Sequence, residues 1–345
     1  MVSLKVLQAG PYISVQDRGR PGFLRAGIAE GGAIDPCALE EGRLLVGNPR
    51  GCAALEMLGL GGRFEAVDEA LCMALTGAVF AANLDDKIIR PNTSFSLQPG
   101  QVLEIGAAVS GNYGYLSVAG GIDTEPVLAS RSTHIRAGFG GYEGRCLKGG
   151  DVLPVGIVRN STCDLALPLP EQNHSKDIRV LWAAQADLFA EDELQRFVET
   201  RFEISHEIDR MGARLISDGE PVHSKEGLVV LSGAIAAGDI QVPGNGRPIV
   251  LLADRQPTGG YPRIATIIAA DLPDFAQRPA GLTIFFKPVS EQQAVDALVK
   301  MANRMKNLPD QLEKKSSTAI SSDKLLSENL ISGVVSSGDK SRDSQ

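Results

Sequence analysis

Histidine and cysteine are scarce in this chain, with four and five residues respectively among 345. The histidines lie far apart, and the sequence has neither a close pair of cysteines nor a His-Glu-x-x-His motif. Zinc sites need such ligands at short, defined spacings. We therefore predict no metal site. His134 and His206 remain candidates for a role near a substrate, although loop histidines are more often structural or surface groups.

The five cysteines are isolated and odd in number, which is typical of reduced thiols in the cytosol. They are Cys37, Cys52, Cys72, Cys146 and Cys163. The N-terminal residues lack the apolar segment of a signal peptide, and no apolar run approaches the length that spans a bilayer. These features predict a cytoplasmic protein with no membrane partner.

Positive charge is not in excess, because 34 Lys and Arg residues stand against 42 Asp and Glu, for a formal net charge of −8. The basic residues are scattered along the chain. A protein that binds nucleic acid usually presents a basic face. We therefore expect no nucleic-acid partner.

Two motifs of group-transfer enzymes are also missing. Residues 333–341 resemble a phosphate-binding loop, but Asp339 interrupts the pattern and no strand–helix frame surrounds it. The chain has no Ala-Met-Lys-Met-like site for a biotinyl-lysine. A reaction that needs ATP or biotin would therefore require another chain to supply the site.

The most informative stretch that is present covers residues 251–265. An apolar run at 248–253 predicts a buried strand, and polar side chains follow it before Gly-Gly and Tyr-Pro pairs. A carboxylate, a guanidinium, an amide and a hydroxyl at a strand end are typical of a functional loop. An ordinary polar hairpin is the alternative, because both pairs are common turn signals. The residues concerned are Asp254, Arg255, Gln256, Thr258, Gly259 and Gly260.

A second polar loop follows an apolar segment near the N-terminus. It contains Gln16, Asp17, Arg18 and Arg20 beside glycines. The planar fork of arginine suits bidentate capture of a carboxylate or phosphate. A surface ion pair around a turn is equally compatible with the pattern and would contribute little to stability.

A third cluster lies at residues 130–141. Its side-chain donors are followed by glycines, and such a run can form an anion-binding concavity of backbone N–H groups. It does not match the dinucleotide fingerprint, because the third glycine is wrongly spaced and no helix follows. A glycine-rich loop between strands is the alternative. The candidate residues are Arg131, Ser132, Thr133, Arg136, Gly138, Gly140 and Gly141.

Short apolar segments separated by Gly, Pro, Asn and Asp turns predict a mainly β protein with minor α. Asp35 is placed to cap a helix that has Pro36 in its first turn. A Pro-rich stretch suggests a boundary between two β-barrel-like domains. The predicted organisation is an N-terminal domain (1–165), a linker (166–176), a C-terminal domain (177–290), a helix (291–308) and a disordered tail (309–345).

The three polar loops and three further motifs occur in an order that resembles the KipA/allophanate hydrolase subunit 2 family, also called the biotin-dependent carboxyltransferase family. The further motifs are Gly-Gly-Ala-Ile-Asp-Pro (31–36), Leu-Val-Gly-Asn-Pro (45–49) and Asp-Arg-Met-Gly (209–212). The resemblance covers about residues 2–290, with Ile34 and Pro257 departing from the usual Met and Thr. It implies two cyclophilin-like β-barrel domains.

The family includes the C subunit of bacterial 5-oxoprolinase. This implies an amide hydrolase subunit that acts when 5-oxoproline, ATP and water give glutamate, ADP and phosphate. The implied partners are a KipI/PxpB-like B subunit and a PxpA-like A subunit of the LamB/YcsF type, with ATP used by the complex.

Two alternatives stay open, because fold and family do not fix the substrate. The first is a biotin-dependent carboxyltransferase component for urea or a similar amide, with biotin carried by another chain. The second is a non-catalytic regulatory module that binds a KipI-like protein, for which intact polar loops would not be required.

Under the enzymatic interpretation, three carboxylates orient arginines or act as acid/base groups: Asp17, Asp35 and Asp254. Arg18, Arg20 and Arg131 would hold an anionic oxygen, and glycine N–H groups would stabilise developing charge. The amide edge of a small substrate would be fixed by Gln16, Gln241, Gln256 and Thr258. Arg210 either joins this site or forms a structural pair with its neighbour Asp209.

Overall fold

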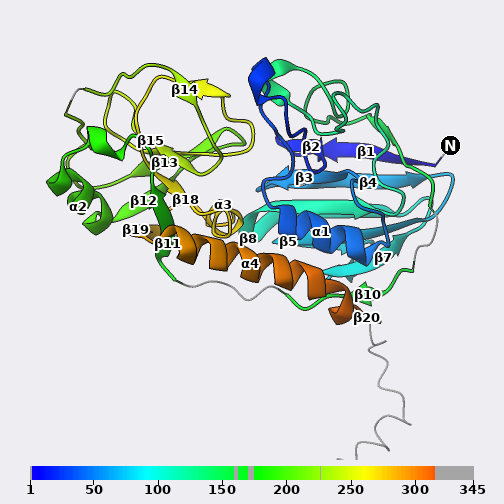
Figure 1. Ribbon diagram of the computed structural model, residues 1–345. Coiled ribbons are helices and arrows are strands. Elements are labelled where there is room, and N and C mark those ends of the chain that lie inside the picture. Colours follow the sequence, from blue (N-terminus) through cyan, green and yellow to red (C-terminus); the bar gives the residue numbers. More distant parts are fainter. Residues whose placement is uncertain (1, 159–161, 170–174, 226, 315–345) are drawn as a thin grey trace, which may run out of the picture.

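The structure, a computed structural model, describes residues 2–158, 162–169, 175–225 and 227–314. Strands dominate and helices are few, so the predicted mainly β class with minor α is confirmed. Figure 1 shows two β-rich units, with the long helix α4 (Glu291–Asn307) running along the lower side of both in this view. Within the described residues, no helix combines the length and apolar character needed to cross a bilayer.

The N-terminal unit is a branched sheet of eleven strands. Its two longest strands, β5 (Leu71–Leu84) and β8 (Val102–Val118), form an antiparallel pair with several register shifts. The shorter strands are β1 (Ser3–Ala9), β2 (Ile13–Gln16), β3 (Ala54–Leu58), β4 (Gly62–Val67), β6 (Lys87–Ile88), β7 (Thr93–Leu97), β9 (Val152–Pro154), β10 (Leu165–Ala166) and β20 (Glu313–Lys314). Of these, β6 and β7 pair with β5, and β3 and β4 pair with β8.

Helix α1 (Pro36–Leu45) packs on this sheet and begins where the sequence predicts. The Asp35 carboxylate accepts hydrogen bonds from the N–H groups of Cys37 (3.1 Å) and Ala38 (3.0 Å). Pro36 occupies the first helical position, where no N–H is needed.

The C-terminal unit is a closed barrel in the strand order β11-β18-β15-β16-β13-β12-β19. Its neighbouring strands are antiparallel except β11 and β19, which are parallel. The strands are β11 (Asp177–Trp182), β12 (Phe202–Ile208), β13 (Gly212–Ile216), β15 (Asp239–Gln241), β16 (Ile249–Leu251), β18 (Arg263–Ile267) and β19 (Thr283–Pro288). Helix α2 (Glu191–Glu199) packs Phe197 against Phe202 and Phe286 of the barrel.

A small two-stranded antiparallel sheet of β14 (Gly233–Ala234) and β17 (Thr258–Gly259) stands apart from the barrel sheet. It includes part of the polar stretch that follows β16. Helix α3 (Leu272–Ala276) lies on the side of the barrel that faces the N-terminal unit.

The two units share an interface that is both apolar and polar. Tyr113, Tyr115 and Leu252 belong to one buried cluster that contains residues of both units. The side chain of Gln277, just after α3, bonds to the backbone of Tyr113 through its Oε1 (3.0 Å) and its Nε2 (2.8 Å). The relative position of the units is therefore set by packing and by directional bonds.

Two sequence predictions need correction. The sequence predicts a disordered tail from residue 309, yet β20 pairs with β10, so the chain returns to the N-terminal sheet after α4. The tail beyond residue 314 lies outside the described residues. The prediction of five isolated thiols is wrong for two of them, because Cys72 and Cys163 form a disulfide between β5 and the segment before β10.

Candidate active site

The loop after β2 and residues 130–141 are joined by the buried carboxylate of Asp17. Its Oδ1 accepts hydrogen bonds from the Gly19 N–H (2.8 Å) and from the hydroxyls of Ser130 and Ser132 (both 2.6 Å). Its Oδ2 accepts one from the Arg131 N–H (2.6 Å). Four donors occupy most of the acceptor sites of this carboxylate, so its observed role is to hold the two loops together.

Gln16 and Thr133 lie on the same seam. The Gln16 Nε2 donates to the Ser14 hydroxyl (2.9 Å) and to the Thr133 carbonyl (3.1 Å). The Thr133 hydroxyl donates to the Val15 carbonyl (3.1 Å). These buried bonds fasten the third polar loop along β2.

The glycines of this loop serve its own packing. A Cβ at Gly140 would lie 2.3 Å from the Ser132 carbonyl oxygen, and one at Gly141 would lie 1.8 Å from the Thr133 hydroxyl. Gly138 ends a short 3₁₀ helix, Ile135–Ala137, in the left-handed conformation. The bare backbone of residues 138–141 is therefore explained by the fold of the loop.

Arg20 is the most enclosed cation of the site, with 1% of its surface exposed. Its Nη2 donates to the Ser132 carbonyl, and its guanidinium lies 4.9 Å from the centroid of the Phe139 ring. Burial lowers the pKa of Arg20, while the nearby carboxylates of Asp17 and Asp254 act to raise it. Arg20 Nη1 and Asp254 Oδ1 both lie close to Gly31, so the structure brings all three polar loops together.

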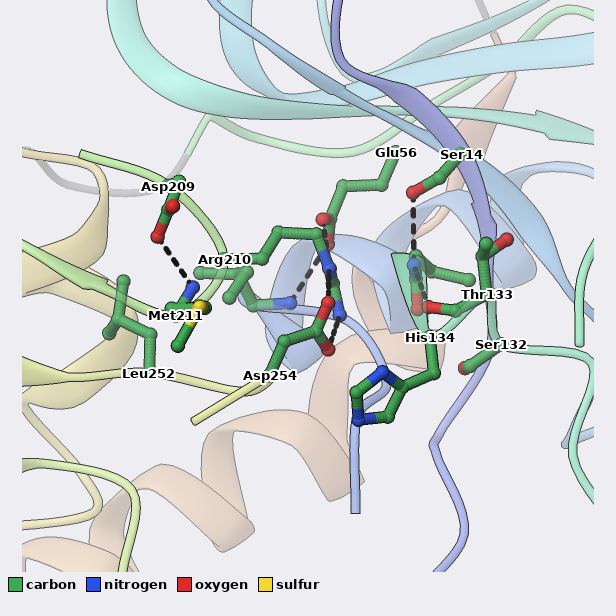
Figure 2. A network of polar contacts seen from close by, with 12 residues as sticks. Ser14, Glu56, Ser132, Thr133, His134, Asp209, Arg210, Met211, Leu252 and Asp254 are labelled. Atoms are coloured by element: carbon green, nitrogen blue, oxygen red, sulfur yellow. Dashed lines mark hydrogen bonds and ion pairs between the residues drawn. The ribbon is translucent and has the colours of Figure 1, made fainter. Parts of the chain in front are cut away.

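Asp254 is held by an ion-paired cluster that crosses the two units (Figure 2). Arg210, in the turn between β12 and β13, donates from Nε to Asp254 Oδ2 (2.8 Å) and from Nη2 to Oδ1 (2.9 Å). Its Nη1 donates to Glu56 on β3, and Nη2 also reaches the Gly32 carbonyl (2.7 Å). Burial acts to lower the pKa of Arg210, but the two carboxylates outweigh it and raise the pKa above its ordinary value.

Arg210 is therefore a structural cation, but it pairs with Asp254 and Glu56 and not with the adjacent Asp209. Asp209 instead accepts hydrogen bonds from the N–H groups of Met211 (2.7 Å) and Gly212 (3.1 Å). The predicted pair of adjacent residues is wrong, and the true partners come from distant parts of the chain.

The second oxygen of Glu56 accepts from the Tyr115 hydroxyl (2.7 Å) and from the Ile34 N–H (2.9 Å). Burial raises the pKa of Tyr115, and the carboxylates of Glu56 and Asp35 raise it further, so the phenol remains a donor. Asp35 caps α1 and accepts from the Gln277 Nε2 (2.9 Å). This geometry gives Asp35 a structural role, and a catalytic one stays a prediction.

Beside the barrel strands lies a polar pocket of about 500 Å³. Tyr12 contributes to it from the N-terminal unit, and His206 and Asp209 line it from the barrel. It also gathers five predicted binding residues: Gln241, Arg255, Gln256, Gly259 and Gly260.

A second pocket, of about 640 Å³, lies between the two units and has mainly apolar walls. It is bounded by residues before α1, by α3 and by the first turns of α4, where Leu298 contributes. Gly31 also lines it, and its polar side chains are Glu30, Arg255, Thr266 and Glu291.

Arg255 lines both pockets and is itself buried. Its Nε donates to the Ile235 carbonyl (3.2 Å), and its Nη2 lies 3.9 Å from Glu30 Oε2. Burial lowers the pKa of Arg255, with the carboxylates of Glu30 and Asp239 opposing the shift. A ligand carboxylate would therefore find an incompletely neutralised cation here.

Other predicted residues lie outside these contacts. Arg18 is exposed, and Thr258 is exposed on β17. Arg131 pairs with Asp123 (2.5 Å), while the exposed Arg136 donates from Nη1 to the Met211 sulfur (3.1 Å). Their roles in binding remain predictions. His134 accepts from the Ala137 N–H through Nδ1 (3.2 Å), which leaves Nε2 as the donor nitrogen of the neutral ring.

Two residues of the site, Glu56 and Gly31, are missing from the sequence-based prediction. Glu56 stands inside the otherwise apolar strand Ala54–Leu58, and a charge at such a position indicates a buried partner. Gly31 begins the Gly-Gly-Ala-Ile-Asp-Pro motif, but its neighbours Arg20 and Asp254 become evident only in three dimensions. Across the described part of the chain, no group of three or more His, Cys, Asp or Glu side chains has the geometry to hold a metal ion.

The comparisons with known proteins agree with this architecture. A family model described as the carboxyltransferase domain, subdomains A and B, matches residues 26–288. The C subunit of 5-oxoprolinase from Escherichia coli (strain K12) is 40% identical over 294 residues, which cover 85% of this chain and 94% of the relative. That of Haemophilus influenzae is 37% identical over 294 residues, 84% and 93% of the two chains.

Among solved structures, the K. lactis urea amidolyase matches with a TM-score of 0.80 and 27% identity. The match covers 91% of this chain but 21% of that chain. The present chain therefore corresponds to one part of a much larger protein in that case.

Proposed function

Because this chain belongs to the family defined by subdomains A and B of the carboxyltransferase domain, we propose that it is the C subunit of an ATP-dependent 5-oxoprolinase. One observation carries this proposal: two proteins named as the C subunit of 5-oxoprolinase share 40% and 37% identity with it over nearly their whole lengths. Ring opening of 5-oxoproline to glutamate would require KipI/PxpB-like and PxpA-like partners.

We assign the substrate to the pocket between the two units. Arg255 suits the carboxylate of 5-oxoproline, because it is buried and its nearest acidic partner is 3.9 Å away. Arg20 and Asp254 supply a donor and an acceptor near Gly31, where the three polar loops meet. Arg210 positions Asp254 by a bidentate pair, and its own charge is balanced by Glu56.

Nucleotide binding fits this chain poorly. The glycines at 140 and 141 pack tightly against Ser132 and Thr133, so they do not form a phosphate cradle with room for a ligand. We therefore assign ATP to the partner subunits and derive no step through it here. We also place the complex in the cytoplasm, although the Cys72–Cys163 disulfide is more typical of an oxidising compartment.

A second candidate is carboxyl transfer to urea or a similar amide. The match to the K. lactis urea amidolyase favours it, and biotin would then arrive on another chain. Its amide substrate would meet the same donor and acceptor as 5-oxoproline.

Isolation of the chain with its natural partners separates the two candidates. The chain is captured by an affinity tag from its own cells under native conditions, and its partners are identified by mass and by a streptavidin blot. Two unbiotinylated subunits of the B and A types support the oxoprolinase proposal. A biotinylated carboxylase in their place would contradict it.

A further inference from the structure

The two cysteines of the disulfide differ in their exposure to solvent. Their Cα atoms lie 5.7 Å apart, a usual distance for a disulfide. Cys72 is buried on β5, with 7% of its surface exposed, whereas Cys163 is partly exposed. The Cys163 sulfur is therefore the one that a thiolate from solution would attack.

The other three cysteines compete poorly for the same chemistry. Burial raises the pKa of Cys37 to about 12, and it also raises the pKa values of Cys52 and Cys146. The thiolate is the reactive form of cysteine, so a raised pKa makes a thiol inert near neutral pH. A mild thiol reagent should therefore act on Cys72 and Cys163 alone.

Cys163 leads directly into β10, the strand on which the end of the chain's described part docks. β10 pairs with β20 on one side and with β7 on the other, where a single residue pair, Ala166 and Thr93, is in register. The Leu165 N–H donates to the Ser94 hydroxyl of β7 (2.9 Å). Since β10 is short and has few such bonds, its covalent link to β5 is a substantial part of its attachment.

The disulfide also belongs to the apolar cluster that anchors the end of α4. Cys72 and Leu308 share this cluster, and Cys163, Met305 and Leu312 pack against it. Figure 1 shows β10 and β20 at this end of the helix. No residue of α4 is itself buried. The helix therefore depends on its ends, and its first turns form one wall of the pocket between the units.

We propose that Cys72 and Cys163 are a reversible oxidation site, whose disulfide fastens β10, β20 and the end of α4 to the N-terminal sheet. A disulfide in the cytoplasm is usually transient or redox-sensing, because thiols there are kept reduced. The cytoplasmic setting and any effect on substrate rest on the proposed function. The oxidation site itself rests on the contacts of the two cysteines.

Reduction requires a dithiol and proceeds by exchange. One thiolate of the dithiol attacks the Cys163 sulfur and forms a mixed disulfide, while Cys72 leaves as a thiolate and takes up a proton. The second thiolate then attacks the reductant sulfur of the mixed disulfide, which releases Cys163 as a thiol and closes the disulfide of the reductant. Two electrons and two protons thus pass to the protein, and glutathione disulfide reverses the change by becoming two glutathione thiols.

Hydrogen exchange of the full chain, followed by mass spectrometry, tests this site. The folded protein is oxidised with glutathione disulfide or reduced with dithiothreitol, and peptide mapping identifies the linkage. We expect the amides of residues 163–168 and 305–314 to exchange at least about 10-fold faster in the reduced protein, and those of β18 in the barrel to change by less than about 2-fold. Equal exchange in the two states would overturn the proposal. So would the absence of a Cys72–Cys163 linkage after oxidation, or a linkage that dithiothreitol does not cleave in the folded chain.

Two variants separate the disulfide from the reagents. Cys163→Ser should exchange like the reduced wild type, with or without dithiothreitol. Cys52→Ser, which removes a partly exposed free thiol, should keep the wild-type difference between the two states. Exchange of Cys163→Ser at the rate of the oxidised wild type would contradict the proposal. Because no substrate, partner or ATP is involved, a failure here is distinct from a failure of 5-oxoproline turnover in the assembled complex.

Discussion

At the scale of single residues, the charged side chains of the site differ in how many of their hydrogen-bonding groups have partners in the protein. Asp17 and Arg210 have their hydrogen-bonding capacity largely filled by protein groups, so they fix geometry. Arg20 is buried with two of its donor nitrogens unpaired among the described residues, and the nearest acidic partner of the buried Arg255 is Glu30 at 3.9 Å.

Glu41 provides a test of how burial acts on one charge. It is buried on α1, where it accepts from Asn92 (3.1 Å) and pairs with Arg304 of α4 (3.2 Å). Burial raises the pKa of Glu41 from 4.5 to about 7, with Arg304 opposing the shift. The folded protein therefore keeps this proton to higher pH than the unfolded chain does.

We predict that Glu41 lowers the free energy of unfolding as pH rises from 4.5 to about 7, by about 3 kcal/mol in all. Glu41→Gln should remove this slope, because the amide cannot ionise and the half-exposed Arg304 can be solvated. Urea unfolding at a series of pH values measures the effect. Glu40→Gln, on the same helix, should keep the wild-type slope. An unchanged slope in Glu41→Gln would show that Glu41 does not carry the penalty.

At the scale of elements, Gln277, just after α3, makes four hydrogen bonds to the N-terminal unit. Its Oε1 accepts from the N–H groups of Asn112 and Tyr113 (both 3.0 Å), and its Nε2 donates to Asp35 (2.9 Å) and to the Tyr113 carbonyl (2.8 Å). One side chain thus satisfies backbone groups of β8 and the cap of α1.

Gln277→Leu should lower the free energy of unfolding by about 2–4 kcal/mol, because it leaves two backbone N–H groups and two acceptors without partners. Gln195→Leu, at an exposed position on α2, should change it by less than about 0.5 kcal/mol. Chemical denaturation measures both. Similar midpoints for the two variants would mean that Gln277 is not a structural connection.

Elements with local signals could be predicted from sequence, and those formed by distant residues could not. The start of α1 was predictable because Asp35 and Pro36 act on the turn that follows them. The spacing of apolar residues predicts a helix over 291–308, and α4 spans Glu291–Asn307. The strand β20 could not be foreseen, because its two residues are stabilised only by their pairing with β10.

The same limit applies to the site. The three polar loops are recognisable from their residue types, and the structure brings them together. The partners of Arg210 cannot be recognised from the sequence, since Glu56 is 154 residues away and Asp254 is 44 residues away. The disulfide between Cys72 and Cys163 likewise joins residues 91 positions apart, and the spacing of the cysteines in the sequence does not indicate this pair.

At the scale of the whole molecule, the buried cluster of Glu56, Arg210 and Asp254 links the N-terminal and C-terminal units by ion pairs. It lies next to the apolar interface that contains Tyr115 and Leu252. The substrate pocket we propose lies between the same units. Loss of the cluster should therefore affect both stability and the pocket.

Arg210→Met should destabilise the protein by about 3–5 kcal/mol, because it leaves two buried carboxylates without their cation. Scanning calorimetry should show a lower melting temperature and separate transitions for the two units. Arg214→Met removes an exposed arginine paired with Glu207 (2.6 Å) on the neighbouring strand and should cost less than about 1 kcal/mol. Equal effects of the two substitutions would contradict the structural role of Arg210.

The most direct measurement of the central claim is ADP release by the purified chain combined with purified B- and A-type subunits, with and without 5-oxoproline. We predict release that depends on 5-oxoproline, requires all three chains and yields one glutamate for each ADP. ADP release at the same rate without this chain, or without 5-oxoproline, would contradict the assignment of the chain as a 5-oxoprolinase subunit.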